Sequence, residues 1–277
     1  MHRRLHHSWV SSVLFAFTLS VHARAVSAAD IPRRLPPPGK DISSEAKAEL
    51  LVSASRLQKL LDGKKSWKKD DVSDVAVLVK AVRYAVEHDE FWKEREVGHA
   101  REILALAELR IRQIENGKRP WRTRTGAVVR GYRSTLDGSI QPYGLVVPPS
   151  VSHKKPQALC VWLHGRADRK TDLQFLWERL HARYDGLSSK ALVLHPFGRY
   201  CNAFKSAGEV DVLEAIEHVK TQYPIDPDRI AILGFSMGGA GAWHVGAHYA
   251  GRWVAVAPGA GFAETAQYNR LRKEQYP

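Results

Sequence analysis

The chain has 277 residues, of which 44% are hydrophobic, and this is enough for one large globular domain or for a large domain with a smaller companion. Its formal net charge is +13, but its densest basic run, residues 64–69, is followed at once by Asp70 and Asp71. A nucleic-acid-binding protein would gather such charge on one face beside stacking aromatic side chains. We therefore predict a solvated loop between two helices at this run, with contact to an anionic polymer or a cell surface as the alternative, and no nucleic-acid partner.

The N-terminus has the pattern of an export signal. Arg3 and Arg4 precede a short apolar run at residues 9–21, and small residues follow at 25–29. A positive start, a short apolar stretch and small residues at a cleavage site are typical of a secretory signal peptide, here residues 1–28. A buried helix or a membrane anchor is the alternative, but the run is shorter than the roughly 18 apolar residues that cross a bilayer. We expect a protein exported to the periplasm or the extracellular space, with no membrane span.

A helical region is predicted before any strand. Residues 29–40 are rich in proline and predict an extended spacer. Residues 41–125 then carry apolar side chains at helical spacing in three stretches. The three stripes consist of Leu50, Ala54, Leu57 and Leu61; of Val75, Leu78, Val79 and Val82; and of Ile103, Ala107, Ile111 and Ile114. The sequence of this region indicates no catalytic role.

The pattern changes to strands in the segment 126–277. Two apolar runs, 128–134 and 140–147, flank Asp137 and Gly138, and this arrangement predicts a β-hairpin. Further strands are predicted at 158–163, 191–195, 229–233 and 253–257, with helices near 171–184, 209–223 and 239–249. Apolar strands that alternate with helices indicate an α/β fold, in which a mostly parallel sheet has helices on both faces.

One short motif in this segment indicates a nucleophile. Gly234, Ser236 and Gly238 form a Gly-x-Ser-x-Gly pattern between the strand 229–233 and a helix rich in small residues. A sharp strand-to-helix turn exposes such a serine, and glycines two positions away avoid a collision. The alternative is a turn of a nucleotide-binding fold with an incidental serine. The chain lacks the Gly-x-Gly-x-x-Gly spacing of that fold, so no cofactor is expected.

A second loop supplies candidate oxyanion donors. The strand 158–163 is followed by His164, Gly165 and Arg166. In a fold with this serine turn, one backbone N–H comes from this loop and another from the residue after the nucleophile, Met237. We predict the N–H groups of Met237 and Arg166 as the two donors, with Gly165 as the neighbouring candidate. His164 is predicted to be a packing and hydrogen-bonding residue rather than a general base.

These motifs together resemble the α/β hydrolases, and within them the prolyl-oligopeptidase-like branch, which is close to secreted esterases of the feruloyl and polyhydroxybutyrate type. The resemblance covers about residues 126–277. It rests on the segments 164–166, 225–230 and 234–239, with a further family-like signature at 198–204 and 208–211 that would line the cleft. It implies an α/β-hydrolase sheet and cleavage of a peptide or ester substrate through an acyl-enzyme on Ser236.

The chain departs from this family in its triad. In the family the acid and then the histidine follow the serine in sequence. After Ser236 the carboxylates are Glu264 and Glu274, and the histidines are His244 and His248. Both histidines belong to the helix that runs away from the serine, so neither is expected to reach its hydroxyl, and Glu264 is expected to be a structural loop residue.

The predicted sheet also ends early, at 253–257, where a complete domain would add about two strands. An apolar strand would then form an exposed edge. We expect a C-terminally truncated hydrolase domain, and the sequence leaves open whether this truncated domain is active. The alternatives are a secreted carbohydrate or polyester esterase, and a catalytically inactive hydrolase-fold protein that only binds.

No metal site is expected, because the histidines lack ligand spacing with nearby cysteines or carboxylates.

The two cysteines are predicted to be free thiols. Export would permit a disulfide. However, Cys160 lies inside one predicted strand and Cys201 lies in the loop beyond the next one. A disulfide needs Cα atoms within about 7 Å, so this placement favours two separate thiols.

Overall fold

A computed structural model describes residues 36–152, 154–182 and 190–264. The predicted signal peptide therefore lies outside the described residues, and only positions 36–40 of the spacer lie within them. These five residues form neither helix nor strand. No helix in the described part of the chain is long and apolar enough to cross a bilayer.

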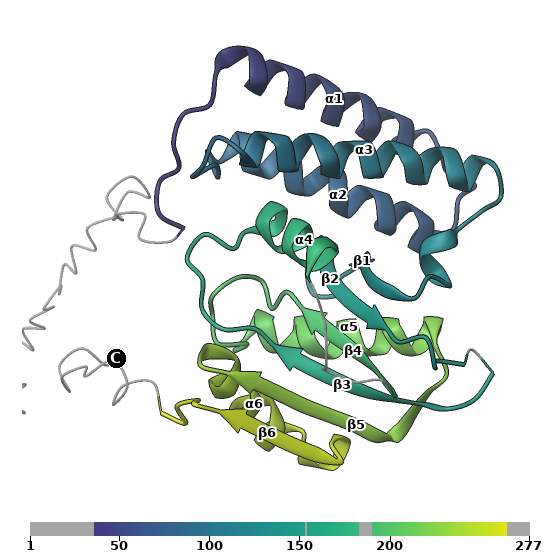
Figure 1. The fold of residues 1–277 in the computed structure, drawn as a ribbon, viewed down its shortest axis with the longest axis vertical. Coiled ribbons are helices and arrows are strands. Elements are labelled where there is room, and N and C mark those ends of the chain that lie inside the picture. The colour runs from purple at the N-terminus through teal and green to yellow at the C-terminus, as the bar shows by residue number, and fades with distance from the viewer. Residues whose placement is uncertain (1–35, 153, 183–189, 265–277) are drawn as a thin grey trace, which may run out of the picture. The chain divides into compact units, whose positions relative to one another are not determined.

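Three α-helices and a short 3-10 helix, η2 (Pro120–Arg122), precede the sheet in the described chain. The α-helices are α1 (Ser44–Asp62), α2 (Lys69–Glu87) and α3 (Glu96–Glu115), and α1 lies on the side of α2 and α3 that faces away from the sheet (Figure 1). All three predicted apolar stripes are buried. The α1 helix begins at Ser43, whose hydroxyl accepts a hydrogen bond from the Ala46 N–H at 3.2 Å, and such a cap satisfies a backbone donor that the first turn leaves free. The basic run between α1 and α2 is the predicted exposed connection.

The sheet has six strands in the order β1-β2-β4-β3-β5-β6. They are β1 (Gly126–Arg133), β2 (Ile140–Val147), β3 (Gln157–Leu163), β4 (Ala191–Pro196), β5 (Ile225–Phe235) and β6 (Ala255–Gly259). The β1–β2 hairpin and the β2–β4 pair are antiparallel, whereas the pairs β3–β4, β3–β5 and β5–β6 are parallel. The predicted mixed, mostly parallel sheet is thus confirmed, although β5 starts four positions before the predicted residue 229 and β6 starts after residue 253.

Helices cover both faces of the sheet, as predicted. They are α4 (Asp172–His181), α5 (Ala207–Gln222) and α6 (Met237–His248). A Cβ atom on Gly144 would lie 2.8 Å from Arg179 Cγ of α4, so this position of β2 faces α4. The preceding residue, Tyr143, points to the other face, where its hydroxyl lies 3.0 Å from Nδ1 of His218 on α5. The α6 helix lies on the α5 side, since Glu209 of α5 contacts its histidines.

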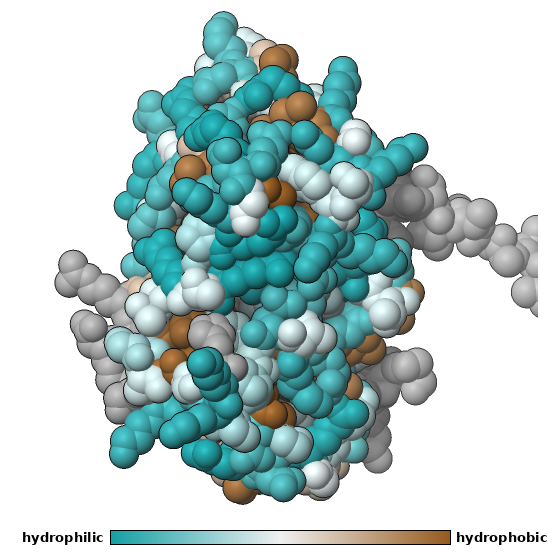
Figure 2. All heavy atoms as spheres, turned by 90° about the vertical axis from the view of Figure 1, so that its right-hand side faces the viewer, coloured by the Kyte–Doolittle hydropathy of each residue, from teal (hydrophilic) through white to brown (hydrophobic). Residues whose placement is uncertain are grey.

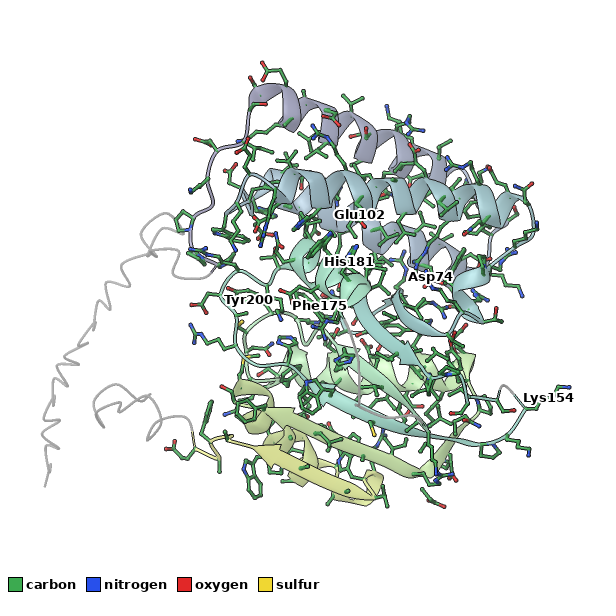
Figure 3. All side chains as sticks on the ribbon, viewed as in Figure 1. Asp74, Glu102, Lys154, Phe175, His181 and Tyr200 are labelled. Carbon is green, nitrogen blue, oxygen red and sulfur yellow. The ribbon has the colours of Figure 1, made fainter. Side chains whose placement is uncertain are left out.

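A buried ionic network joins the helical layer to β1 (Figure 3, which labels Asp74). Asp74 of α2 and Arg130 of β1 are both fully buried, and Arg130 Nε donates to Asp74 Oδ1 at 2.7 Å. Burial alone would raise the pKa of Asp74, but the charge and hydrogen bond of Arg130 hold it below its usual value, helped by Arg110 and the Trp121 indole N–H. Arg110 of α3 also donates to the Val129 carbonyl at 2.8 Å. The outer edge of β1 is therefore covered.

The opposite edge of the sheet, β6, is open in the described chain. Three of its five residues are exposed, and apolar side chains nearby also face solvent: Val254 is 65% exposed and Phe235 is 59% exposed. Figure 2 shows a different face, which is mainly hydrophilic with apolar side chains in small separate groups. The exposed apolar edge predicted for the last strand is thus present.

Both cysteines are free, as predicted. Cys160 lies within β3 and Cys201 lies in the loop after β4, where its thiol donates to the Ala167 carbonyl at 3.4 Å. Burial raises the pKa of both thiols, so neither has the acidic character of a reactive cysteine.

Candidate active site

Ser236 occupies a strained turn between β5 and α6. Its backbone has φ 56° and ψ −119°, a conformation that residues with a side chain rarely adopt. The turn is held from the neighbouring strand, because the Ser236 N–H donates to the Gly259 carbonyl at 2.9 Å. The half-buried side chain makes no hydrogen bond with another described residue. This is the geometry that the Gly-x-Ser-x-Gly motif predicts.

The two motif glycines are required by close backbone contacts. A Cβ atom on Gly234 would lie 2.1 Å from the Gly238 carbonyl oxygen, and one on Gly238 would lie 2.0 Å from the carbonyl oxygen of Leu163. Real Cβ contacts are not shorter than 3.0 Å. Because every contacting atom is backbone, no side-chain rotation could relieve either clash. The glycines therefore let the turn fold back and let α6 approach the end of β3.

The predicted oxyanion loop lies beside the serine. Leu163, the last residue of β3, pairs in register with Gly234 of β5. A Cβ atom on Gly165 would lie 3.9 Å from Ser236 Cβ and 3.6 Å from the Phe235 carbonyl oxygen. The structure thus brings Gly165 and Ser236 together from segments that are distant in sequence.

The two predicted donors are the chain neighbours of these residues, Met237 after Ser236 and Arg166 after Gly165. Met237 is the first residue of α6, and a backbone N–H at this position has no partner within its own helix. Arg166 follows Gly165, and its exposed guanidinium donates from Nε to Asp168 Oδ1 at 2.7 Å. The side chain of Arg166 is thus engaged with Asp168, and its predicted role as an oxyanion donor concerns its backbone N–H only.

His164 connects two loops rather than acting on the serine. Its ring is buried, with Nδ1 2.9 Å from the Gly165 carbonyl oxygen and Nε2 2.9 Å from that of Phe197. Burial lowers its pKa, although both carbonyl contacts favour the protonated ring. This agrees with the predicted packing and hydrogen-bonding role.

The loop after β4 is unusually strained. Besides Gly198, five residues with side chains have positive φ angles: Arg199, Tyr200, Ala203, Phe204 and Ser206. Such strain persists only where surrounding contacts fix the backbone, and it is frequent at functional sites. The family-like signature at 198–204 indicated a role for this segment but gave no sign of the strain.

Contacts from both ends hold this strained loop. The Gly198 N–H donates to Oδ2 of the buried Asp211 at 2.7 Å, and Tyr132 donates to Asp211 Oδ1 at 2.6 Å. Burial raises the pKa of Asp211 to about 6, although both hydrogen bonds act against this. At the other end the Tyr200 hydroxyl donates to the Asp168 carbonyl, so the loop is fastened to the segment that follows Gly165.

Ser206 shows that backbone strain alone does not identify a nucleophile. It precedes α5 with φ 52° and ψ −120°, nearly the values of Ser236. Of these two serines, only Ser236 has an atom within 4 Å of a Cβ atom placed on Gly165 of the oxyanion loop. Ser206 is therefore a natural comparison residue for experiments on Ser236.

The histidines after Ser236 are bound to another residue. Nε2 of His244 lies 2.5 Å from Glu209 Oε2, and Nδ1 of His248 lies 2.9 Å from the same oxygen. Neither ring contacts Ser236, as predicted. Sequence reasoning missed this cluster, since Glu209 belongs to a different helix. Glu274 lies outside the described residues.

A pocket of about 320 Å³ lies near the carboxyl ends of β3 and β4. Because β3, β4 and β5 are parallel, their carboxyl ends lie at the same end of the sheet, and Ser236 follows β5 at that end. The pocket is lined by residues of the loops after β3 and β4 and by α2, among them Thr171, Phe197, Arg199, Tyr200 and Tyr84.

The strand order, the hairpin at its start and the serine turn after β5 decide the fold. It is that of an α/β hydrolase. Residues 202–276, which contain the Ser236 turn, match the model of the prolyl oligopeptidase family. No curated protein matches the chain.

Solved structures similar to this chain include esterases and other hydrolases. A thermostable esterase is 26% identical with a TM-score of 0.38, and the alignment covers 53% of this chain and 44% of the esterase. S-formylglutathione hydrolase from Staphylococcus aureus is 21% identical with a TM-score of 0.39, covering 54% and 62%. A feruloyl esterase module from Clostridium thermocellum is 16% identical with a TM-score of 0.37, covering 54% and 64%. The chain thus spans less than two thirds of each of these structures.

Proposed function

We propose that this protein is a serine hydrolase that cleaves an ester or peptide bond through an acyl-enzyme on Ser236. The observation that carries the proposal is the position of Gly165, whose Cβ would lie 3.9 Å from Ser236 Cβ at a strained strand-to-helix turn. A strained serine beside a loop of backbone donors is the arrangement that acyl transfer uses. The match of residues 202–276 to the prolyl oligopeptidase family supports the same conclusion.

In this proposal the serine oxygen attacks the substrate carbonyl carbon, and the carbonyl oxygen becomes an oxyanion. The backbone N–H groups of Met237 and Arg166 donate hydrogen bonds to that oxyanion. Each such donor lowers the activation barrier by about 3 kcal/mol. The tetrahedral intermediate then expels an alcohol or an amine, which takes up the proton that Ser236 lost. Water attacks the resulting ester of Ser236, the acid leaves, and a proton of that water restores the serine hydroxyl.

The proton of Ser236 needs a base, and this limits what the described residues can do by themselves. His244 and His248 are engaged with Glu209, and His164 is buried between two carbonyl oxygens. This observation favours one alternative function, a hydrolase-fold protein that binds an acyl compound without cleaving it.

A fluorophosphonate probe tests the proposal on the full chain. We expect covalent labelling that Ser236→Ala abolishes and Ser206→Ala leaves unchanged, since Ser206 shares the backbone conformation but lacks the oxyanion loop. Labelling that survives Ser236→Ala would refute Ser236 as the nucleophile. A folded chain that is not labelled, but binds a carboxylic ester in calorimetry, would establish the binding function instead.

The substrate class follows from a second comparison. Peptidases and esterases share the serine, the turn and the donors, so only turnover separates them. We propose to compare an aminoacyl-proline anilide with feruloyl, acetyl and polyester substrates. Preferred cleavage of the anilide would place the protein with the peptidases, and preferred cleavage of the esters would make it a carbohydrate or polyester esterase.

Export remains part of the proposal. The signal-like segment 1–28 predicts a periplasmic or extracellular protein. N-terminal sequencing of the protein recovered from the periplasm or the culture medium would show cleavage after about residue 28. An uncleaved chain that stays with the cytoplasm would refute export.

A further inference from the structure

A cluster outside the serine site brings together three groups that commonly bind metal ions. His244 and His248 are one helical turn apart on α6, and Glu209 reaches them from the first turn of α5. Their ligand atoms, one from each side chain, all lie within 4.8 Å of one another. Imidazole nitrogens four residues apart on a helix point to the same side, and a carboxylate between them completes a two-nitrogen, one-oxygen donor set.

The cluster has the second layer of contacts expected at a metal centre. The Tyr249 hydroxyl donates to Glu209 Oε1 at 2.8 Å, which leaves Oε2 directed at both histidines. Hydrogen bonds of this kind orient ligating carboxylates in metal sites. Glu209 and His244 are largely buried, with side-chain exposures of 15% and 21%, whereas His248 is 53% exposed and gives an ion access from solvent.

Hydrogen bonding alone does not account for the cluster. Nε2 of His244 is buried and lacks a hydrogen bond of good geometry, although Glu209 Oε2 is only 2.5 Å away. The contact with Glu209 is thus an ion pair without good hydrogen-bond geometry, and a metal ion between the two groups would satisfy the buried nitrogen better. With Zn–N and Zn–O distances of about 2.0–2.2 Å and tetrahedral angles, two ligand atoms lie about 3.3 Å apart. If Glu209 moved slightly away from the two rings, the ion would therefore fit among the three ligand atoms.

We propose that Glu209, His244 and His248 bind a divalent transition-metal ion, which we assign as Zn²⁺. Zinc accepts imidazole nitrogens with a carboxylate oxygen, and three protein ligands leave one position for water. The ion would fasten α5 to α6, the helix that begins at Ser236. The site lies beyond the proposed function, because no step on Ser236 requires a metal.

Calorimetric titration of the metal-stripped full chain with ZnCl₂ tests this assignment. We expect Glu209→Gln and His248→Ala each to weaken binding by at least about tenfold, since loss of a ligand costs no less than loss of a residue that orients one. The matched control is His88→Ala, which removes an exposed histidine at the end of α2 and should leave this binding unchanged. His248 is the most exposed ligand, and circular dichroism would verify that its variant folds.

A thermal melt gives the second readout. At a hundredfold excess of Zn²⁺ over its Kd, the melting temperature should rise by about 5 °C or more, and this rise should disappear in Glu209→Gln and His248→Ala. Zinc binding that both variants leave unchanged would place the ion elsewhere, for example on histidines outside the described residues. That result, or no zinc binding at all, would overturn the assignment and leave a cluster that only links two helices.

Discussion

Gly234 offers the sharpest test of the serine turn, because a single methyl group would be placed against backbone. In Gly234→Ala the new Cβ would lie 2.1 Å from the Gly238 carbonyl oxygen and 2.3 Å from its carbonyl carbon. Both atoms belong to the first turn of α6, so the start of the helix must move by about 1 Å to restore a normal contact. We expect the free energy of unfolding to fall by about 3 kcal/mol, the upper end of the cost of overpacking.

The same displacement should reach the chemistry. Ser236 lies between Gly234 and the displaced helix, and a shift of about 1 Å in a reacting group can lower the rate roughly a hundredfold. Urea unfolding would measure the stability, and the rate of fluorophosphonate labelling would measure the serine. Labelling should fall by more than the fraction of unfolded protein explains.

Gly98 is the matched control. It lies in the first turn of α3, it is exposed, and a Cβ there would meet nothing within 4 Å. Gly98→Ala should stabilise the protein by about 0.4–1 kcal/mol, because alanine restricts the unfolded chain. If Gly234→Ala had the urea midpoint and labelling rate of the parent protein, the steric explanation of the motif would be wrong.

Three further outcomes follow from the fold. Asp74→Asn should lower the free energy of unfolding in urea by about 3–5 kcal/mol, because it leaves a buried arginine without its counter-charge, and a loss below 1 kcal/mol would contradict this. The contribution of His164 and His195 to stability should be complete above pH 6.5 and be lost at lower pH, since burial lowers the pKa of both and only the unfolded chain then takes up their protons. Asp211, with its raised pKa of about 6, acts in the opposite direction, so a stability that increases on acidification would show that it outweighs the histidines. Val254→Lys should reduce self-association in light scattering by placing a charge beside the open edge, and a parent protein that is monomeric at all concentrations would refute this.

Local patterns predicted the serine turn correctly because its causes are local. The strand, the two glycines and the helix of small residues are consecutive in the sequence, and the steric conflict arises among them. The start of β5 was less predictable. Pro227 argues against a strand at this point, yet β5 begins at Ile225. A register shift between Gln157 and Leu159 of β3 accommodates the intervening residues, and only the neighbouring strand shows this.

The Glu209 cluster and the Asp74 network were missed because they depend on contacts between separate elements. His244 and His248 have the spacing of a metal-binding pair, but nothing in the sequence near them supplies the carboxylate. For Asp74 a signal did exist. It lies four positions before Leu78 and so falls on the apolar stripe of α2, where a charged residue indicates a buried partner.

The two edges of the sheet differ, and this limits how copies of the described chain can assemble. The β1 edge is occupied by α2 and α3, with Arg110 already bonded to a carbonyl group of that strand. Within the described residues, the β6 edge is the one left open to a strand from another molecule. Two copies of the described residues joined β6 to β6 would cover each other's open edge, and such a pair is closed by its twofold symmetry.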